Sequence, residues 1–449
     1  SDTAGELHLI SGTVAGGIYN EVISNFSIIA GGSDNLTSGN ASVITGGTYN
    51  RARGDHSFIG GGGGTFDPDL YEVVDSNSAV GDYTVISGGL GNLAIGLVST
   101  IGGGSGNRTL NSILLNAEIS GNGISEMRGS KNNDIKSSKK ISFNPNAGGN
   151  GATIGGGYGN ITRDQATTIS GGGYNHAEGP FSTVSGGGNN RATGAGASIG
   201  GGDDNIATGY EARVSGGGPN KARGDWSVVG GGGGLPLADS NSANGHYSTV
   251  PGGRANKALG DYSFVAGFNA KAAHTGAFVW ADANGAEFAS TAGNQFSVRA
   301  SGGTRIYSNG LLTAGVTLAS GGSSWSAVSD RNMKENFQTI DGEKLLTNLG
   351  AISILTWNYK AQDKSIRHIG PMAQDFYAAF NVGEDDTHIT TIDADGVALA
   401  AIQALIKQNE QLSTRLIKME ATIKSLVENA NSNTANKSLG EVKQTDVNH

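Results

Sequence analysis

The sequence predicts a mainly β chain: a parallel β-solenoid built from 15-residue coils, followed by a β connector, an α/β domain and a C-terminal helix. Three observations support this fold class. Asparagines recur every fifteen residues, small and apolar residues alternate beside them, and the glycine-rich composition ends near residue 329. Glycine contributes 76 of the 449 residues without a G-X-Y period, so a collagen triple helix is excluded.

The 15-residue unit reads roughly S-x-(I/V)-x-G-G-x-x-N-x-A-x-G. Its aliphatic residue and its alanine are constrained, whereas their neighbours vary freely. This alternation is typical of two short strands that each have one buried face, and the glycines suit turns with positive φ. The asparagines that mark the unit are Asn20, Asn35, Asn50, Asn160, Asn175, Asn190, Asn205 and Asn220.

One coil offers its interior only one branched aliphatic residue and one alanine. This apolar surface is too small to offset the conformational entropy lost when fifteen residues are ordered. We therefore expect the coils to stack and several chains to associate, with each chain closing the cores of the others. We expect three chains, although the repeat alone does not establish that number.

Breaks in the repeat predict the domain organisation. Two insertions share the sequence DSNSA, and loops that leave a rigid coil are candidates for receptor binding. After Asn269 the period lapses, and aromatic residues alternate with polar ones as in short strands. The predicted segments are a head block at 1–107 with an insertion at 62–80, an excursion at 108–150, a second head block at 151–268 with an insertion at 232–246, a β neck at 269–328, an α/β domain at 329–396, a coiled coil at 397–428 and a disordered tail at 429–449.

The segment from residue 402 fits four heptads. One polar residue, Asn409, lies at a core position, where it lowers stability but fixes the register and number of helices. The pattern predicts a coiled coil; the alternative is a helix that packs on its own domain. The core positions are Ile402, Asn409, Leu416 and Ile423 at a, and Leu405, Leu412, Met419 and Leu426 at d.

Composition excludes several classes of function. The absence of cysteine rules out disulfides and thiolate metal sites, and the net charge of -9 argues against a general nucleic-acid binder. No apolar run approaches the roughly 18 residues of a membrane span. We therefore expect no cofactor, no metal site, no nucleic-acid partner and no direct insertion into a membrane.

The stretch SIIAGGSDNLTSGNASVITGGTYNRARGDHSFIGGG resembles the head repeat of trimeric autotransporter adhesins. The resemblance covers roughly 10–107 and 151–268. It implies a left-handed parallel β-roll that is trimeric and displayed on a surface, and it says little about any ligand.

Three motifs near the C-terminus, SDRNMKENF, RHIGPMAQDFYAAF and DADGVALAAIQALIKQNEQL, together resemble the endosialidase-type intramolecular chaperone domain of phage tail fibres and tailspikes. The resemblance implies a domain that trimerises the chain, helps the fibre to assemble and then cuts itself off. The family's serine and lysine fall on Ser329 and Lys334, so the cut bond would be Val328–Ser329. His368 or Gln374 would support the reaction, or would equally serve packing or hydrogen bonding within the domain.

This chemistry is consistent with what serine and lysine can do. A serine hydroxyl is a poor nucleophile unless a base removes its proton, and a neutral lysine can be that base. The pKa of a lysine, about 10.4 in water, must then fall through burial. Folding of the trimer would supply the burial. The reaction would be a single turnover on the chain itself, and we expect no other enzymatic activity.

These features predict a homotrimeric fibre protein, either a tail fibre or a surface adhesin. Its head loops would bind a host-surface receptor, glycan or protein, and its other end would attach to a larger particle or a cell envelope. The expected location is extracellular: a virion tail, the fibre of a secretion or injection machine, or a cell surface. Two alternatives remain open, namely a glycan-degrading tailspike with its active site in the β head, and a passive structural spacer.

Overall fold

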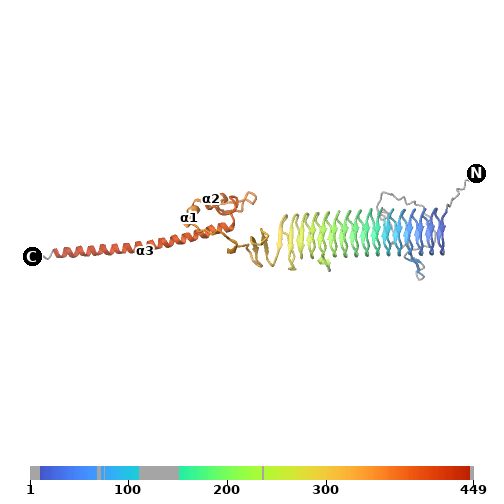
Figure 1. Ribbon diagram of the computed structural model, residues 1–449, viewed down its shortest axis with the longest axis horizontal. Coiled ribbons are helices and arrows are strands. Elements are labelled where there is room, and N and C mark those ends of the chain that lie inside the picture. Colours follow the sequence, from blue (N-terminus) through green and yellow to red (C-terminus); the bar gives the residue numbers. More distant parts are fainter. Residues whose placement is uncertain (1–10, 68–71, 75, 111–150, 235–236, 445–449) are drawn as a thin grey trace, which may run out of the picture. The chain divides into compact units, whose positions relative to one another are not determined.

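The computed structural model describes residues 11–67, 72–74, 76–110, 151–234 and 237–444, and it divides into two units, 1–327 and 328–449. The first unit is a stack of flat coils, and each regular coil contributes one strand to each of two sheets (Figure 1). The sheets contain sixteen and fifteen strands, paired in parallel. The predicted mainly β class and its parallel β-solenoid are therefore confirmed.

Most strands are only two residues long because a turn follows each of them in the 15-residue unit. The first sheet contains β1 (Thr13–Val14), β3 (Ile28–Ile29), β5 (Val43–Ile44), β7 (Phe58–Ile59), β11 (Val85–Ile86), β13 (Thr100–Ile101), β15 (Thr153–Ile154), β17 (Thr168–Ile169), β19 (Thr183–Val184), β21 (Ser198–Ile199), β23 (Arg213–Val214), β25 (Val228–Val229), β27 (Thr249–Val250), β29 (Phe264–Gly267), β31 (Phe278–Ala281) and β33 (Phe296–Arg299). The second sheet contains β2 (Glu21–Val22), β4 (Leu36–Thr37), β6 (Arg51–Ala52), β10 (Ser78–Ala79), β12 (Leu93–Ala94), β14 (Arg108–Thr109), β16 (Ile161–Thr162), β18 (His176–Ala177), β20 (Arg191–Ala192), β22 (Ile206–Ala207), β24 (Lys221–Ala222), β26 (Ser242–Ala243), β28 (Lys257–Ala258), β30 (Ala270–Ala272) and β32 (Phe288–Ala289).

The stack is continuous across the breaks in the repeat. Phe58 pairs with Val85 across the first insertion, and Thr100 pairs with Thr153 across the predicted excursion at 108–150. The first two residues of that excursion form β14, a regular strand of the second sheet. Residues 111–150 lie outside the described part of the chain.

The core of the solenoid is closed within a single chain, which corrects one expectation from the sequence. The aliphatic residues of the first sheet, such as Ile44 and Ile169, are 0% exposed, and so are the alanines of the second sheet, such as Ala177 and Ala192. The two sheets pack face to face, so branched side chains of one sheet fill the space that the alanines of the other sheet leave. Each chain therefore does not need another chain to close its core.

A ladder of buried asparagine side chains joins successive coils. Asn190 shows the pattern: its Oδ1 accepts a hydrogen bond from the Asn205 amide at 3.0 Å. Its Nδ2 donates to the carbonyl oxygens of Gly186 at 2.9 Å and Gly202 at 2.6 Å. The side chain is 0% exposed, so these bonds satisfy polar groups that cannot reach water. The asparagines that mark the repeat thus hydrogen-bond each coil to its neighbours from inside the solenoid.

Glycine is required where neighbouring coils approach most closely. Gly172 has a φ of +84°, and a Cβ atom placed on it would lie 2.1 Å from the carbonyl oxygen of Gly187 in the next coil. Both the backbone conformation and the contact exclude other residues at this position. This explains why the Gly pair recurs with the period of the coil.

The insertions and the end of the unit depart from the 15-residue pattern. In the first insertion β8 (Thr65–Asp67) and β9 (Glu72–Val74) form an antiparallel hairpin, and the second contains the 3-10 helix η3 (Leu237–Asp239). Stacking continues beyond Asn269, where the sequence predicts a neck, as far as β32 and β33. An antiparallel sheet follows, consisting of β34 (Thr304–Tyr307), β35 (Gly315–Leu318) and β36 (Ser326–Ala327).

The second unit is a small α/β domain with a long helix. Helix α1 begins after Asp341, whose carboxylate accepts hydrogen bonds from the Glu343 and Lys344 amides. Among the residues of this unit whose burial the structure describes, the buried apolar side chains are few: Leu345, Phe376, Val397 and Ala401. The elements are η4 (Arg331–Met333), α1 (Gly342–Ala351), β37 (Leu355–Trp357), β38 (His368–Gly370), α2 (Ala373–Phe380) and α3 (Thr391–Gln444), and the two strands pair antiparallel.

Helix α3 presents a stripe of apolar side chains to solvent within one chain. All seven apolar residues at the predicted a and d positions are at least half exposed, from 52% for Ile402 and Met419 to 61% for Leu426. The helix also differs from the prediction of a disordered tail from residue 429, because it extends to Gln444. The start of that tail contains alanine and no proline, so the helix can propagate through it. Among the described helices, none combines the length and apolarity needed to span a membrane.

Candidate functional site

The two residues predicted to carry the chemistry are in contact. The Nζ atom of Lys334 donates a hydrogen bond to the Oγ atom of Ser329 at 2.7 Å. Ser329 follows Val328 at the start of the second unit, so the hydroxyl lies next to the carbonyl group of the preceding peptide bond. The arrangement places a nucleophile, a potential base and a potential substrate bond within the seven residues from Val328 to Lys334.

A tight turn brings the lysine back to the serine. The Asp330 carboxylate caps η4 by accepting hydrogen bonds from the Asn332 amide at 2.9 Å and from its Nδ2 at 3.1 Å. The Lys334 amide then donates to the Arg331 carbonyl oxygen at 3.2 Å. These bonds reverse the chain between the serine and the lysine. Asp330 and Asn332 are therefore positioning residues that the spacing of serine and lysine alone did not reveal.

The dyad is open to solvent in the single chain. Ser329 and Lys334 are both exposed, and Val328 is half-buried. In this contact the Lys334 amine is the donor and the serine oxygen is the acceptor. A lysine that acts as a base must instead be neutral and accept the serine proton. The single chain thus has the required contact without the burial that the chemistry needs.

The two candidate supporting residues lie elsewhere on the domain surface. His368, on β38, contacts the Gln362 Oε1 atom through its Nε2 atom at 2.8 Å, and its ring packs 4.9 Å from that of Trp357. Gln374 is exposed in the first turn of α2. Among the hydrogen bonds of the described residues, none joins either side chain to Ser329 or Lys334. The His368 side chain thus contacts Gln362 and the rings of Trp357 and Tyr359.

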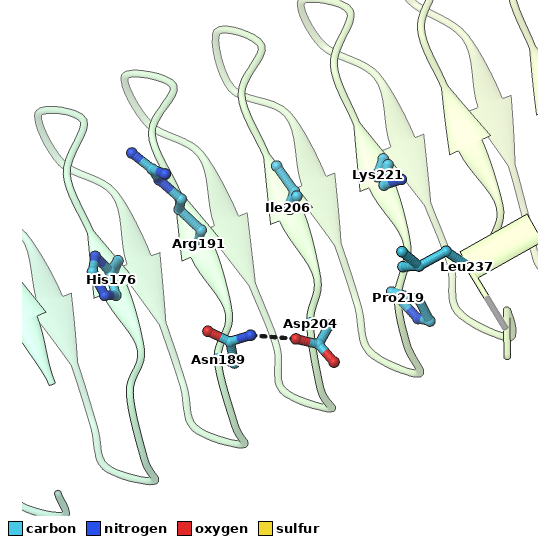
Figure 2. A pocket seen from close by; sticks show the side chains of 8 residues that line it. All are labelled: His176, Asn189, Arg191, Asp204, Ile206, Pro219, Lys221 and Leu237. Atoms are coloured by element: carbon cyan, nitrogen blue, oxygen red, sulfur yellow. Dashed lines mark hydrogen bonds between the residues drawn. The ribbon is translucent and has the colours of Figure 1, made fainter. Parts of the chain in front are cut away.

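A second candidate site lies on the solenoid, beside the second insertion. Figure 2 shows side chains from successive strands of the second sheet next to side chains from the adjoining turns. Together with Leu237 of η3 they line a groove of about 710 Å³. The groove combines basic, apolar and amide groups with one carboxylate, that of Asp204. Its lining residues are His176, Asn189, Arg191, Asp204, Ile206, Pro219, Lys221 and Leu237.

An ion-pair cluster fixes one end of this groove. The Glu178 carboxylate contacts His176 at 3.1 Å, Arg191 at 2.8 Å and Arg163 at 3.2 Å. The hydrogen bond from His176, followed by the contributions of Arg191 and Arg163, lowers the pKa of Glu178 to about 2, although burial opposes the shift. Two side chains of the groove, His176 and Arg191, are therefore held in place by one carboxylate. Within the described ranges, no group of three or more His, Asp or Glu side chains is arranged to hold a metal ion.

Comparison with known proteins gives one result for the second unit. Residues 329–382 match the family model Peptidase_S74, chaperone of endosialidase. The matched segment begins at Ser329 and includes η4, α1, both strands and α2. No curated protein matches the chain. The C-terminal unit is therefore similar to the chaperone of endosialidase, and the resemblance read from its sequence motifs is confirmed for residues 329–382.

Proposed function

We propose that the chain is a homotrimeric fibre protein of the tail-fibre or tailspike type, whose C-terminal unit drives assembly and then cleaves the Val328–Ser329 bond. A chaperone-of-endosialidase region behind a parallel β-solenoid fits such a fibre. The observation that carries the cleavage proposal is the 2.7 Å hydrogen bond between Lys334 and Ser329, at the first residue of the matched segment. The protein would act outside the cell, on a virion or another extracellular particle.

Cleavage would proceed in two steps, transfer of the Val328 acyl group to the Ser329 oxygen and hydrolysis of the resulting ester. Neutral Lys334 removes the hydroxyl proton of Ser329, and the serine oxygen attacks the Val328 carbonyl carbon. The carbon–nitrogen bond breaks, the lysine returns the proton to the departing amine, and Val328 becomes an ester of the serine oxygen. Water then hydrolyses the ester, which yields a Val328 carboxylate and the free serine hydroxyl.

Assembly is what would switch this chemistry on. Lys334 and Ser329 are both exposed in one chain, and in the proposed assembly a neighbouring copy would cover them and supply the burial that favours a neutral lysine. The unpartnered apolar stripe of α3 supports association, because a helix with exposed side chains at every a and d position gains burial only from other helices. Asn409, at an a position, would set the register of those helices. Cleavage would then report that three chains have come together.

The head would supply attachment. The groove beside the second insertion combines the ion-paired Arg191 with apolar side chains on an otherwise regular solenoid, which supports a role in binding a glycan or a protein of a host surface. Deleting the lining residue Leu237 together with η3 should weaken target binding. Unchanged binding would favour a different surface of the head.

Self-cleavage is tested by substituting the dyad in the full chain. The native protein should separate into 1–328 and 329–449 on a denaturing gel, and intact masses should place the cut after Val328. Ser329→Ala and Lys334→Ala should both remain at full length. Ser326→Ala and Lys344→Ala are matched controls that remove a nearby serine and lysine, and both should still be cut. Full cleavage of Ser329→Ala would rule the mechanism out.

A further inference from the structure

The two faces of the solenoid differ sharply in charge. In most strands the first residue points outward, because the second residue is buried. In β30 the outward residue is the middle one, Lys271, between the buried Ala270 and Ala272. Along the first sheet these outward residues form a column of β-branched, aromatic and hydroxyl side chains in which Arg213 is the single charged member among the described strands. The column comprises Thr13, Ile28, Val43, Phe58, Val85, Thr100, Thr153, Thr168, Thr183, Ser198, Arg213, Val228, Thr249, Phe264, Phe278 and Phe296.

The second sheet carries charge along the equivalent column. Seven of its outward residues are charged and six of those are cations: Glu21, Arg51, Arg108, Arg191, Lys221, Lys257 and Lys271. His176 occupies the same column. The outward column of the second sheet therefore carries six cations and one anion, interspersed with Leu36, Leu93, Ile161, Ile206 and Phe288, whereas the column of the first sheet carries one charged residue among the described strands.

Small side chains on the uncharged face would also allow another chain to pack closely against it. The residue that follows each buried aliphatic residue of the first sheet is small in every regular coil. At the end of the column the rings of Phe264, Phe278 and Phe296 stack at 5.0 and 4.8 Å, and Phe296 is 74% exposed. The small residues are Ala15, Ala30, Thr45, Gly60, Ser87, Gly102, Gly155, Ser170, Ser185, Gly200, Ser215, Gly230 and Pro251.

Symmetry decides which face can meet its own copies. When identical chains associate in parallel around an axis, residues of the same number meet at the same height. A column of lysine and arginine on the axis would place like charges opposite one another at many levels, which is destabilising. A column of valine, threonine and phenylalanine avoids this repulsion and gains apolar burial.

The geometry points to the outward face of the first sheet as the surface on which two further copies of this chain pack, in parallel and in register, leaving the basic face of the second sheet outside. This inference rests on the proposed trimer and adds the face by which the heads meet. It leaves the groove beside the second insertion on the outer side of the fibre, because His176, Arg191, Ile206 and Lys221 all belong to the second sheet. It also gives the heads an association surface that is independent of their already closed cores.

Cysteine cross-linking of the full chain tests the face directly, because the natural sequence contains no cysteine. Thr168→Cys places a thiol in the uncharged column, and Ile161→Cys places one at the equivalent outward position of the same coil on the second sheet. Both variants are combined with Ser329→Ala to keep the chain intact. A short bis-maleimide should convert more than half of the Thr168→Cys chains into covalent dimers, and should leave Ile161→Cys chains largely uncoupled.

Light scattering of the same samples distinguishes failure of the proposed packing face from failure of the proposed trimer. Three copies with cross-links at position 168 alone support the face. Three copies with cross-links at 161 alone, or at neither position, overturn the face and leave the proposed trimer standing. A single copy overturns both. Thr100→Cys and Thr249→Cys extend the test to other coils, and each should react as Thr168→Cys does if the packing runs along the head.

Discussion

Replacing one asparagine of the ladder should lower the local stability of the solenoid by a measurable amount. Asn190→Ala removes the Oδ1 acceptor of the Asn205 amide and the Nδ2 donor to Gly186 and Gly202. The Gly202 carbonyl keeps the hydrogen bond from the Gly188 amide, whereas the Asn205 amide and the Gly186 carbonyl lose the partner that the ladder provides. At about 1–3 kcal/mol for each buried polar group left unsatisfied, the expected cost is about 2–6 kcal/mol.

Amide hydrogen exchange measured by mass spectrometry can locate this loss. At about 1.4 kcal/mol for each factor of ten, a cost of 2 kcal/mol corresponds to roughly 30-fold faster exchange through local opening. The acceleration should appear in peptides from 183–207 and fade over the neighbouring coils. Coils around 28–44 should keep their rates, because contacts in a solenoid are confined to nearest neighbours.

Asn189→Ala is the matched control. Asn189 precedes the ladder residue, is exposed, and its side chain donates to Asp204 at the turn. Its loss should accelerate exchange less than tenfold, because water can replace an exposed hydrogen bond. Equal exchange in the two variants would refute the reasoning, since it would mean that the buried carboxamide contributes no more than an exposed one.

Two further predictions follow from the ion-pair cluster and from α3. Glu178→Gln should reduce stability most above pH 4.5, by up to roughly 3 kcal/mol: its folded pKa of about 2 lies below its ordinary 4.5, so the stabilisation is complete above 4.5 and is lost as the pH falls toward 2. Denaturant unfolding at pH 6 and pH 2.5 checks this, and a gap between native and variant that does not narrow at pH 2.5 would contradict it. Leu416→Lys should weaken association by about 1.5–3 kcal/mol per chain, measured by sedimentation, whereas Ile417→Lys at an off-stripe position should not; equal effects would argue against a heptad interface.

The solenoid fold could be predicted from the repeat because of two properties of short strands. Alternation at Ile44 and Ala52 indicated which side chains face inward, and the 15-residue spacing indicated parallel stacking, because equivalent residues of successive coils pair directly. What alternation did not indicate is how the interior is closed. That depends on the distance between the two sheets, and branched residues on one sheet matched with alanines on the other leave no gap for a second chain to fill.

The asparagines show a different limit. Their spacing marked the repeat, but their role depends on carbonyl oxygens four residues before and twelve residues after each one, such as Gly186 and Gly202 around Asn190. Those groups converge only when glycines let adjacent coils approach closely. The dyad residues were predicted from the resemblance of the C-terminal motifs to the chaperone family, whereas the turn that brings Lys334 to Ser329 depends on hydrogen bonds of Asp330 and Arg331 that the spacing does not show. The exposure of the dyad was not predictable from the motifs either, because it depends on what packs around it.

A core closed within each chain changes what an assembly domain has to do. The coils do not require partners to hide their aliphatic residues, so the remaining problem is alignment: a parallel stack of similar 15-residue coils loses few contacts when one chain slips by a whole coil. In the proposed trimer, an uncharged column of threonines and valines would penalise such a slip only weakly, whereas a coiled coil carrying Asn409 at a single core position would penalise every misalignment. Alignment would be needed only until the heads have packed, so a C-terminal unit that sets the register would be dispensable afterwards.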